Sequence, residues 1–477
     1  MTDYERYDGL GLAELVKSRA ASAKELLNAA IERIEARNPS VNAVVNRMYD
    51  RAETAIAAGL PAGPLTGVPY ALKDLGVYDT GTVTSSGSAF FRDAVADHDS
   101  EIVARMKRAG LVILGKTNTS EFGLSPSVEP KLFGPTRNPW NLARSAGGSS
   151  GGAAAAVAAG MLPMAHGTDG GGSIRIPASC CGLFGLKPTR ARTPMGPDLG
   201  ENWSGSSIGH AVTRSVRDSA ALLDATAGPD IGDPYWAPPP QRPYLAEVGA
   251  DPGRLKIAVA RRPWSGHPVD AECLDAVSSA AKLCGDLGHH VEEASPFIDE
   301  ELHNQARRII RAANTRATLD ARGKALGRAV RPDDVESITW LTAEIARSVT
   351  AADYAWAIRA THQIGRVVAR FFMRYDVLLT PTMCHPPAKL GLLSMSGPDP
   401  DVYWRAHPRA VAFTALFNTA GNPAMSVPLY WADGLPIGVQ FAAAFGAEAI
   451  LFRLAAQLEA AMPWADRRPP PDGKKVS

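Results

Sequence analysis

The chain has 477 residues, of which 45% are hydrophobic and 21% charged, so it is long enough to bury a large core. Fifty basic residues stand against 49 acidic ones, which gives a formal net charge of +1 at pH 7. This balance provides no field of one sign that would collect nucleic acid or an anionic membrane, and we expect neither as a partner.

The five cysteines follow neither a metal-binding nor a disulfide pattern. Cys180 and Cys181 are adjacent, and the other three stand alone without CxxC or His/Cys spacing. We expect free thiols, as in a reducing cytosol, and no bound metal. The N-terminus lacks the apolar core of a signal peptide, and the weakly polar run 151–165 is too short to span a membrane. These features predict a cytoplasmic protein.

The first third of the chain predicts helices followed by strands. Residues 10–37 have the pattern of two helices, and the second opens with a capping box from Ser22 to Glu25. These N-terminal helices are the candidate surface for a homodimer. The short apolar segment 68–72 predicts a strand, after a loop rich in Pro and Gly.

Helix and strand patterns then alternate. A helix predicted over 99–109 leads into the apolar run 111–114, which is typical of a buried strand. Further core strands are expected at 255–260 and 377–380, and the 270–375 segment has a mainly helical pattern. This alternation is typical of α/β layering, and the absence of repeats or a clear linker favours one large domain.

Two clusters of glycine and serine are the most unusual feature of the sequence. The first covers 147–152 and contains Ser149 and Ser150; the second covers 170–173. Glycine lets main-chain N–H groups approach a ligand closely, and a run of glycines can aim several of them at one spot. Such a nest binds an anion or stabilises the oxyanion of a tetrahedral intermediate.

Three other interpretations of these clusters compete. A phosphate-binding loop would need a Gly-Lys-Ser/Thr continuation, which the sequence lacks. A nucleophile elbow, G-x-S-x-G, matches at both Ser149 and Ser150, but residues 138–145 before it form no apolar strand. A tight turn before a close-packed alanine helix over 153–159 is the structural alternative. It explains neither the serines nor the second cluster.

The clusters belong to a longer series of motifs that resembles the amidase signature family. The matching segments are 65–74, 114–123, 133–141, 147–153, 167–177, 181–189, 418–424 and 433–440. Within the family, the stretches 138–141, 166–170 and 461–464 are most similar to hydrolases of cyclic nylon oligomers. The match is strong from about residue 60 to 215 and again from about 375 to 460, and the segment between them is much less specific.

The resemblance implies a single α/β domain with a central mixed β-sheet covered by helices on both faces. Its parts are N-terminal helices at 1–60, a signature core at 61–215, a variable, mainly helical substrate-side region at 216–375, and the rest of the core at 376–477.

The family's catalytic residues fall on Lys73, Ser149 and Ser173. Ser173 is then the nucleophile that forms an acyl-enzyme, and Lys73 is the base. Ser149, which follows a cis peptide bond in the family, relays the proton of Ser173 to Lys73. A lysine acts as a base only when neutral, so its site must lower its pKa. The resemblance also implies an oxyanion hole made by the N–H groups of Gly170, Gly171, Gly172 and Ser173, and no cofactor.

Several neighbours have supporting roles in this interpretation. Ser150 and Thr168 are expected to hydrogen-bond the relay loops, and Asp169 and Arg175 to form an ion pair that braces them. His166 is expected to be packed or hydrogen-bonded, because the family chemistry uses no histidine.

Two further expectations concern the surroundings of these residues. Asp74 should face away from Lys73 on the other side of the strand. Most relatives carry a larger residue in place of Gly170, which predicts a looser loop here.

The substrate is expected to be a small amide. In the family the loop that follows 121–123 borders the acyl pocket, and here it contains Leu124, Ser125 and Pro126, with no cation for a carboxylate. This favours neutral, fairly hydrophobic amides, such as anilides, lactam oligomers or carbamates. The other wall is expected to include Arg311 and Asn314.

Two alternatives remain at this stage. A subunit of an aminoacyl-tRNA amidotransferase shares these motifs but depends on partner subunits and ATP. A catalytically silent binding protein on the same scaffold belongs to a different functional class. Hydrolysis of a simple amide by the isolated chain without ATP discriminates among the three.

Overall fold

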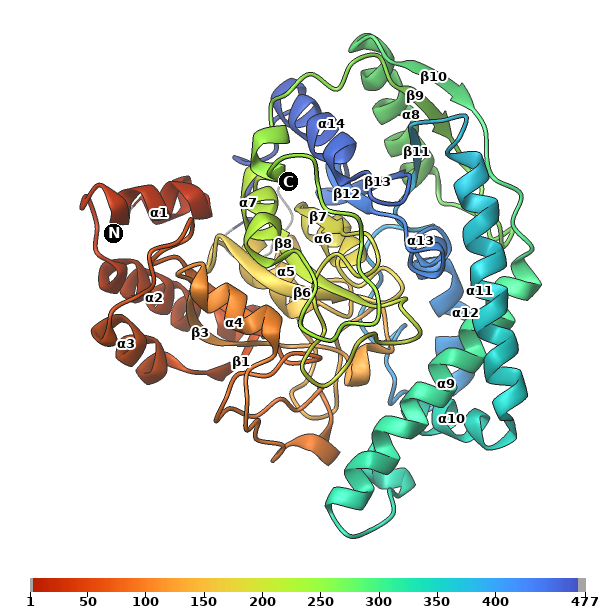
Figure 1. The fold of residues 1–477 in the computed structure, drawn as a ribbon, viewed down its shortest axis with the longest axis horizontal. Helices are drawn as coiled ribbons and strands as arrows, with labels where there is room; N and C mark the ends of the chain where they lie inside the picture. Colours follow the sequence, from red (N-terminus) through yellow and green to blue (C-terminus); the bar gives the residue numbers. More distant parts are fainter. Residues whose placement is uncertain (1–2, 471–477) are drawn as a thin grey trace.

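The computed structural model describes residues 3–470 and is built around an eight-stranded sheet (Figure 1). The strands are β1 (Val44–Arg47), β2 (Pro69–Lys73), β3 (Val112–Thr117), β4 (Arg137–Asn138), β5 (Asn141–Ser145), β6 (Met164–Asp169), β7 (Phe184–Lys187), β8 (Ile208–Thr213), β9 (Lys256–Val259), β10 (His290–Glu293), β11 (Val377–Pro381), β12 (Ala424–Ala432) and β13 (Leu435–Ala443). The large sheet has the order β10-β9-β11-β13-β12-β7-β8-β6, and β1-β3-β2 and β4-β5 form two small sheets.

The sheet is mixed. Strands β9, β10 and β11 run parallel to one another, and the remaining neighbours in the large sheet pair antiparallel. The helices are α1 (Gly9–Lys17), α2 (Ala23–Val41), α3 (Tyr49–Ala58), α4 (Glu101–Arg108), α5 (Gly151–Ala158), α6 (Arg175–Cys181), α7 (Val216–Thr226), α8 (Ala271–Asp286), α9 (Glu300–Ala325), α10 (Ser337–Ile345), α11 (Ala351–Phe371), α12 (Pro400–Val411), α13 (Ala415–Ala420) and α14 (Glu448–Ala461).

Helices cover both faces of the large sheet, as β11 illustrates. Val377 and Leu379 pack into a core with side chains of α8 and α14, whereas Leu378 between them packs with side chains of α11 and α13. Successive side chains of a strand point to opposite faces, so a strand covered on both sides is apolar throughout. The prediction of a single α/β domain with a mixed sheet between helices is confirmed.

The predicted elements lie close to their expected places. The four predicted strands correspond to β2, β3, β9 and β11, and the predicted helices to α1, α2 and α4. The capping box is present, with the Ser22 hydroxyl accepting from the Glu25 N–H and the Glu25 carboxylate accepting from the Ser22 N–H. Strand β10 interrupts the region predicted to be mainly helical.

Strands β6 and β8 were not predicted because polar residues interrupt their apolar pattern. Strand β6 contains His166, Gly167 and Thr168, yet all of its residues are buried. It pairs antiparallel with β8, so that Asp169 lies opposite Ile208. Polar residues are tolerated here because they find partners inside the fold, several of which belong to the site described below.

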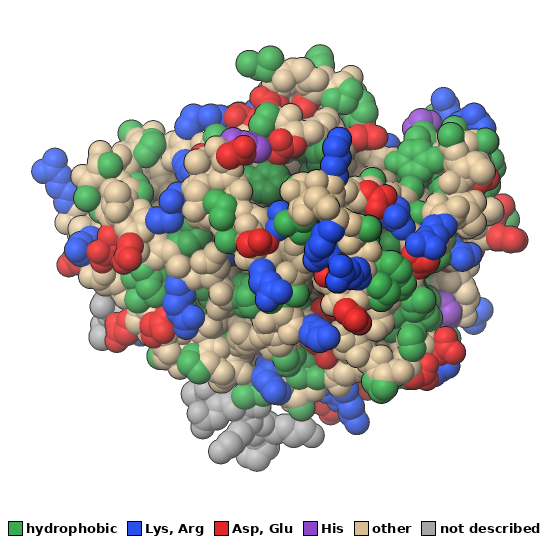
Figure 2. Space-filling view, turned by 90° about the horizontal axis from the view of Figure 1, so that it is seen from below, with side chains coloured by type: hydrophobic (Ala, Val, Ile, Leu, Met, Phe, Trp, Pro, Cys, Tyr) green, Lys and Arg blue, Asp and Glu red, His purple; other side chains and the backbone are tan. Residues whose placement is uncertain are grey.

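Helices α9 and α11 pack along each other at one side of the molecule (Figure 1). All five cysteines are buried free thiols. Within residues 3–470, no helix is both long and apolar enough to cross a membrane. Acidic and basic side chains are intermixed on the face that Figure 2 shows.

Candidate active site

Lys73 is the last residue of β2, and its side chain is completely buried. Its Nζ donates to Ser149 Oγ at 2.7 Å and to Thr168 Oγ1 at 2.8 Å. Burial lowers the pKa of Lys73 to about 7, against the opposing effect of the negative charge on Asp169. The lysine is therefore poised to exchange a proton with a hydroxyl near neutral pH.

Ser149 lies in the turn before α5, and its peptide bond with Gly148 is cis. Two glycines let the neighbouring loops approach Ser149 closely. A Cβ atom on Gly148 would lie 2.6 Å from the Ser127 nitrogen, and one on Gly123 would lie 3.1 Å from Ser149 Oγ. Gly123 also has a φ of +71°, which favours glycine. Only residues without a side chain allow these loops to close around the serine.

Ser173 lies between β6 and α6 and is partly exposed. It lines a small cavity together with Gly148 and the loop residues Leu124, Ser125 and Pro126. The Ser150 N–H donates to the Ser173 carbonyl oxygen at 3.2 Å, which joins the two serine-bearing loops. The structure thus brings Ser173 beside the loop of Ser149, at the wall of an open space.

The N–H groups of the second glycine cluster do not all point into this space. The Gly172 N–H donates to Asp169 Oδ1 at 2.7 Å, so it is not free for a substrate oxygen. This corrects the prediction that Gly172 belongs to an oxyanion hole. The backbone N–H groups of Gly170, Gly171 and Ser173 donate no hydrogen bond within residues 3–470. Three donors of the predicted four are available.

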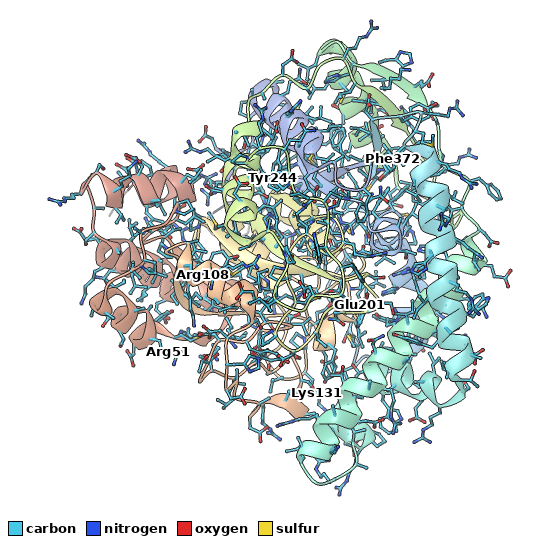
Figure 3. The ribbon with its side chains drawn as sticks, in the orientation of Figure 1. Arg51, Arg108, Lys131, Glu201, Tyr244 and Phe372 are labelled. Carbon is cyan, nitrogen blue, oxygen red and sulfur yellow. The ribbon has the colours of Figure 1, made fainter. Side chains whose placement is uncertain are left out.

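Gly170, the first glycine of the cluster, does not leave a loose loop, contrary to the prediction. A Cβ atom on Gly170 would lie 3.1 Å from Cε3 of Trp203, so the indole ring occupies the place of a side chain. In the view of Figure 3, Glu201, two residues before this tryptophan, lies between β6 and α9. The loop that carries Trp203 therefore packs onto the glycine cluster.

Asp169 and Arg175 form the expected ion pair and are both fully buried. Burial alone would raise the pKa of Asp169, but the charge and hydrogen bonds of Arg175 outweigh it and hold the pKa below its usual range. The carboxylate also accepts from Asn418 Nδ2 at 2.9 Å and from the Gly172 and Ile174 N–H groups. The pair fixes the backbone on both sides of Ser173.

The Ser150 hydroxyl bonds the loop backbone as predicted, whereas the Thr168 hydroxyl accepts from Lys73 Nζ. Ser150 Oγ donates to the Thr168 carbonyl at 3.2 Å and accepts from the Thr168 N–H at 3.3 Å. The buried ring of His166 accepts from the Lys73 N–H through Nδ1 at 3.3 Å, and burial lowers its pKa to about 3. Neutral and enclosed, it acts as a packed hydrogen-bond acceptor. Asp74 faces another loop, where it accepts from the Ser85 N–H at 3.0 Å.

A second cavity of about 600 Å³ adjoins the small one. The two share Trp203, Arg307, Arg311, His407 and Val411 in their walls. This volume lies in the range of small-molecule sites. Of the residues predicted to border the substrate, Leu124, Ser125 and Pro126 line the small cavity and Arg311 lines both.

The prediction for Asn314 is wrong. Its side chain is absent from both cavity walls and instead donates to the Tyr354 hydroxyl at 3.1 Å and to the Ile310 carbonyl at 2.8 Å. It lies three residues after Arg311 on α9 and is directed toward α11 rather than into the cavity.

Sequence reasoning missed Trp203, Arg307 and His407. A signal existed for the arginine, since His303, Arg307 and Arg311 recur every four residues and so share one face of α9. The two arginines also correct the argument for a neutral substrate. Residues 124–126 supply no cation, but the wall contributed by α9 does. Within residues 3–470, no group of three His, Cys, Asp or Glu side chains has the arrangement of a metal site.

Comparisons with known proteins agree with this architecture. The profile of the Amidase family matches residues 25–452. The chain is 40% identical over 476 residues to a 6-aminohexanoate-cyclic-dimer hydrolase of Paenarthrobacter ureafaciens, covering 97% of this chain and 96% of that protein.

Solved structures show the same likeness. The structure of a 6-aminohexanoate cyclic dimer hydrolase complexed with substrate superposes with a TM-score of 0.93 at 39% identity, covering 98% of this chain and 100% of that one. A bacterial aryl acylamidase of the amidase signature family gives a TM-score of 0.87 at 29% identity, with 98% and 99% covered. The chain therefore belongs to the amidase family of hydrolases.

Proposed function

We propose that the chain hydrolyses amides through Ser173, Ser149 and Lys73 by way of an acyl-enzyme. The observation that carries this proposal is the buried Lys73, with a pKa of about 7 and its Nζ 2.7 Å from Ser149 Oγ, on a loop bonded to that of Ser173. The names of the relatives, a cyclic dimer hydrolase and an aryl acylamidase, support the reaction class.

The first half of the reaction transfers the acyl group to the enzyme. Neutral Lys73 accepts the proton of Ser149 Oγ, which accepts that of Ser173 Oγ as this oxygen attacks the amide carbon. The free N–H groups of Gly170, Gly171 and Ser173 stabilise the negative charge that develops on the carbonyl oxygen. When the C–N bond breaks, the proton passes from Lys73 through Ser149 Oγ to the leaving amine, while Ser173 Oγ remains in the ester bond of the acyl-enzyme.

The second half repeats the steps with water as the nucleophile. Water gives its proton to the same relay, attacks the ester carbon and releases a carboxylic acid, while Ser173 regains its proton. The apolar side chains of Leu124 and Pro126 beside Ser173 favour an apolar group next to the scissile carbonyl. Anilides, lactam oligomers and aryl carbamates are the first substrates to assay.

A fluorophosphonate probe tests the nucleophile. We expect mass spectrometry to locate the probe on Ser173, and Ser173→Ala to lower kcat by several orders of magnitude with an unchanged circular dichroism spectrum. Ser150→Ala is the matched control, because this hydroxyl only bonds the backbone of Thr168, and it should still be labelled at Ser173. Labelling of Ser150 in the wild type would contradict the proposal.

A further inference from the structure

Arg307 and Arg311 lie one turn apart on α9 and line both cavities near Ser173. Arg307 is the closer of the two to the glycine cluster, since a Cβ atom on Gly171 would lie 3.4 Å from its Nη2. Arg311 lies with its guanidinium 5.8 Å from the centre of the Trp404 ring. Both cations face the space from which a substrate would reach the nucleophile.

Neither arginine has a carboxylate or hydrogen-bond acceptor as partner in the part of the chain that the structure describes, although Arg311 lies over the Trp404 ring. Within residues 3–470, their guanidinium groups make no ion pair and donate no hydrogen bond, and Arg311 Nε is buried without a partner. Desolvation lowers the pKa of Arg307 to about 10, which is still well above neutral, and it also lowers that of Arg311. A guanidinium group keeps its charge in proteins at neutral pH. Buried polar groups are nearly always paired, and an unpaired one needs an explanation.

The surrounding groups do not neutralise this charge. His407 is partly buried near both arginines, and desolvation together with their positive charges holds its pKa well below its usual range. The Tyr403 hydroxyl is occupied, because it donates to the Leu124 carbonyl oxygen at 2.7 Å. The carboxylate of Glu300 accepts from Asn304 Nδ2 at 2.9 Å and forms no ion pair with Arg307. The wall that α9 contributes to both cavities therefore carries two guanidinium groups that form no ion pair within residues 3–470.

We propose that Arg307 and Arg311 form a subsite for a carboxylate on the amide substrate, an inference that rests on the proposed amidase activity. A guanidinium group binds a carboxylate through two parallel hydrogen bonds, and exclusion of water strengthens the attraction. Apolar side chains of Ile176, Trp203 and Val411 line the small cavity together with the two arginines and Leu124. The geometry fits an amide whose carboxylate is separated from the scissile bond by an apolar spacer.

Two substrate pairs test the subsite and show which end carries the carboxylate. The first pair consists of two 4-nitroanilides made from the same dicarboxylic acid. In one of them the second carboxyl group is free, and in the other it is converted to a carboxamide. The second pair is an N-acyl ω-amino acid and its carboxamide. We expect the wild type to prefer the carboxylate member of one pair by about tenfold or more in kcat/KM, and that pair identifies the acyl or the amine side.

Arg307→Met and Arg311→Met link that preference to the two side chains. Each should lower kcat/KM on the preferred carboxylate substrate by about tenfold or more, mainly through KM, and change the carboxamide by less than about threefold. Arg359→Met on α11 removes the same charge from an exposed residue outside both cavities and should leave both rates unchanged. The arginine variants should melt no lower than the wild type, because each loses an unpaired desolvated charge.

Three outcomes would overturn the subsite: no carboxylate preference in either pair, equal losses on both members of a pair, or the same loss in Arg359→Met. If the wild type cleaves no amide, the proposed function fails, and calorimetry then decides the subsite alone. Adipate should bind Ser173→Ala protein and lose about tenfold or more in affinity when Arg311→Met is added. Equal binding by the two proteins would overturn the subsite.

Discussion

Lys73 Nζ lies 2.7 Å from Ser149 Oγ, and its hydrogen bonds within residues 3–470 go to hydroxyl groups alone. Since burial lowers the pKa of Lys73 to about 7, the neutral amine predominates only above neutral pH. We expect kcat/KM to fall about tenfold for each pH unit below 7 and to reach a plateau in mild alkali. A pH–rate profile on a 4-nitroanilide measures this.

Two variants test whether Lys73 is the group whose protonation lowers kcat/KM at acidic pH. Lys73→Arg keeps the charge but has no accessible neutral form, so kcat/KM should fall by about a hundredfold or more. Lys187 is the control, because it is also buried with a pKa of about 7 but donates to the Pro188 carbonyl oxygen. Lys187→Met should show the same fall of kcat/KM below pH 7 as the wild type. Retention of more than about a tenth of the activity by Lys73→Arg would show that Lys73 is not the base.

Lys73→Met should be inactive and yet more stable than the wild type at pH 7. The folded-state pKa of about 7 lies below the ordinary 10.5, so the unfolded chain binds more protons between these values and wild-type stability rises with pH across that window. The substitution removes a burial cost on the order of 4 kcal/mol at pH 7, partly offset by the hydrogen bonds it loses. Urea unfolding at pH 7 and pH 10 should show an advantage that shrinks with pH. A less stable variant at pH 7 would contradict this account.

Arg175→Met should destabilise the fold by about 3–5 kcal/mol, because it leaves the buried Asp169 carboxylate without its cation. Asp169→Asn combined with Arg175→Met removes both charges and should cost less than the two single changes added together. Guanidinium unfolding of the wild type, the two single variants and the double variant measures the coupling free energy between the two side chains. Additive losses would mean that the two side chains act independently.

Substitution of Gly170 and of Gly172, which both precede Ser173, should have unequal effects on kcat. Gly172 has a φ of +131°, and a Cβ atom there would lie 2.4 Å from Thr414 Oγ1, so Gly172→Ala should displace the loop and lower kcat by about a hundredfold or more. Gly170→Ala brings its methyl group to 3.1 Å from the Trp203 ring, which can shift slightly, and should cost less than about tenfold. Steady-state kinetics of both variants checks the order, and the reverse order would contradict it.

The part of the site that local motifs encode was predictable from sequence. Lys73, Ser149 and Ser173 lie in motifs that resemble a family, and the structure places them around connected loops. The strand that ends at Lys73 was predictable because a run of buried apolar residues precedes it.

Features that depend on distant contacts were not predictable. The Gly172 N–H is occupied because the Asp169 side chain folds back onto the loop, which backbone composition does not encode. Arg307 reaches the site only because α9 packs across the cavity, and Asn314 misses it because its position on the helix turns it toward Tyr354. Segment 216–375 carried no motif that fixed this orientation.

Lys73 belongs to the three-stranded sheet, whereas Thr168 belongs to the eight-stranded one and Ser173 follows it. The Lys73 N–H donates to the His166 ring at 3.3 Å across the junction between them. A fragment that ends before β6 thus contains Lys73, the proposed base, without Ser173, the proposed nucleophile. During refolding, turnover should return only after the two sheets have docked, so enzymatic activity reports the assembly of the halves rather than the formation of either.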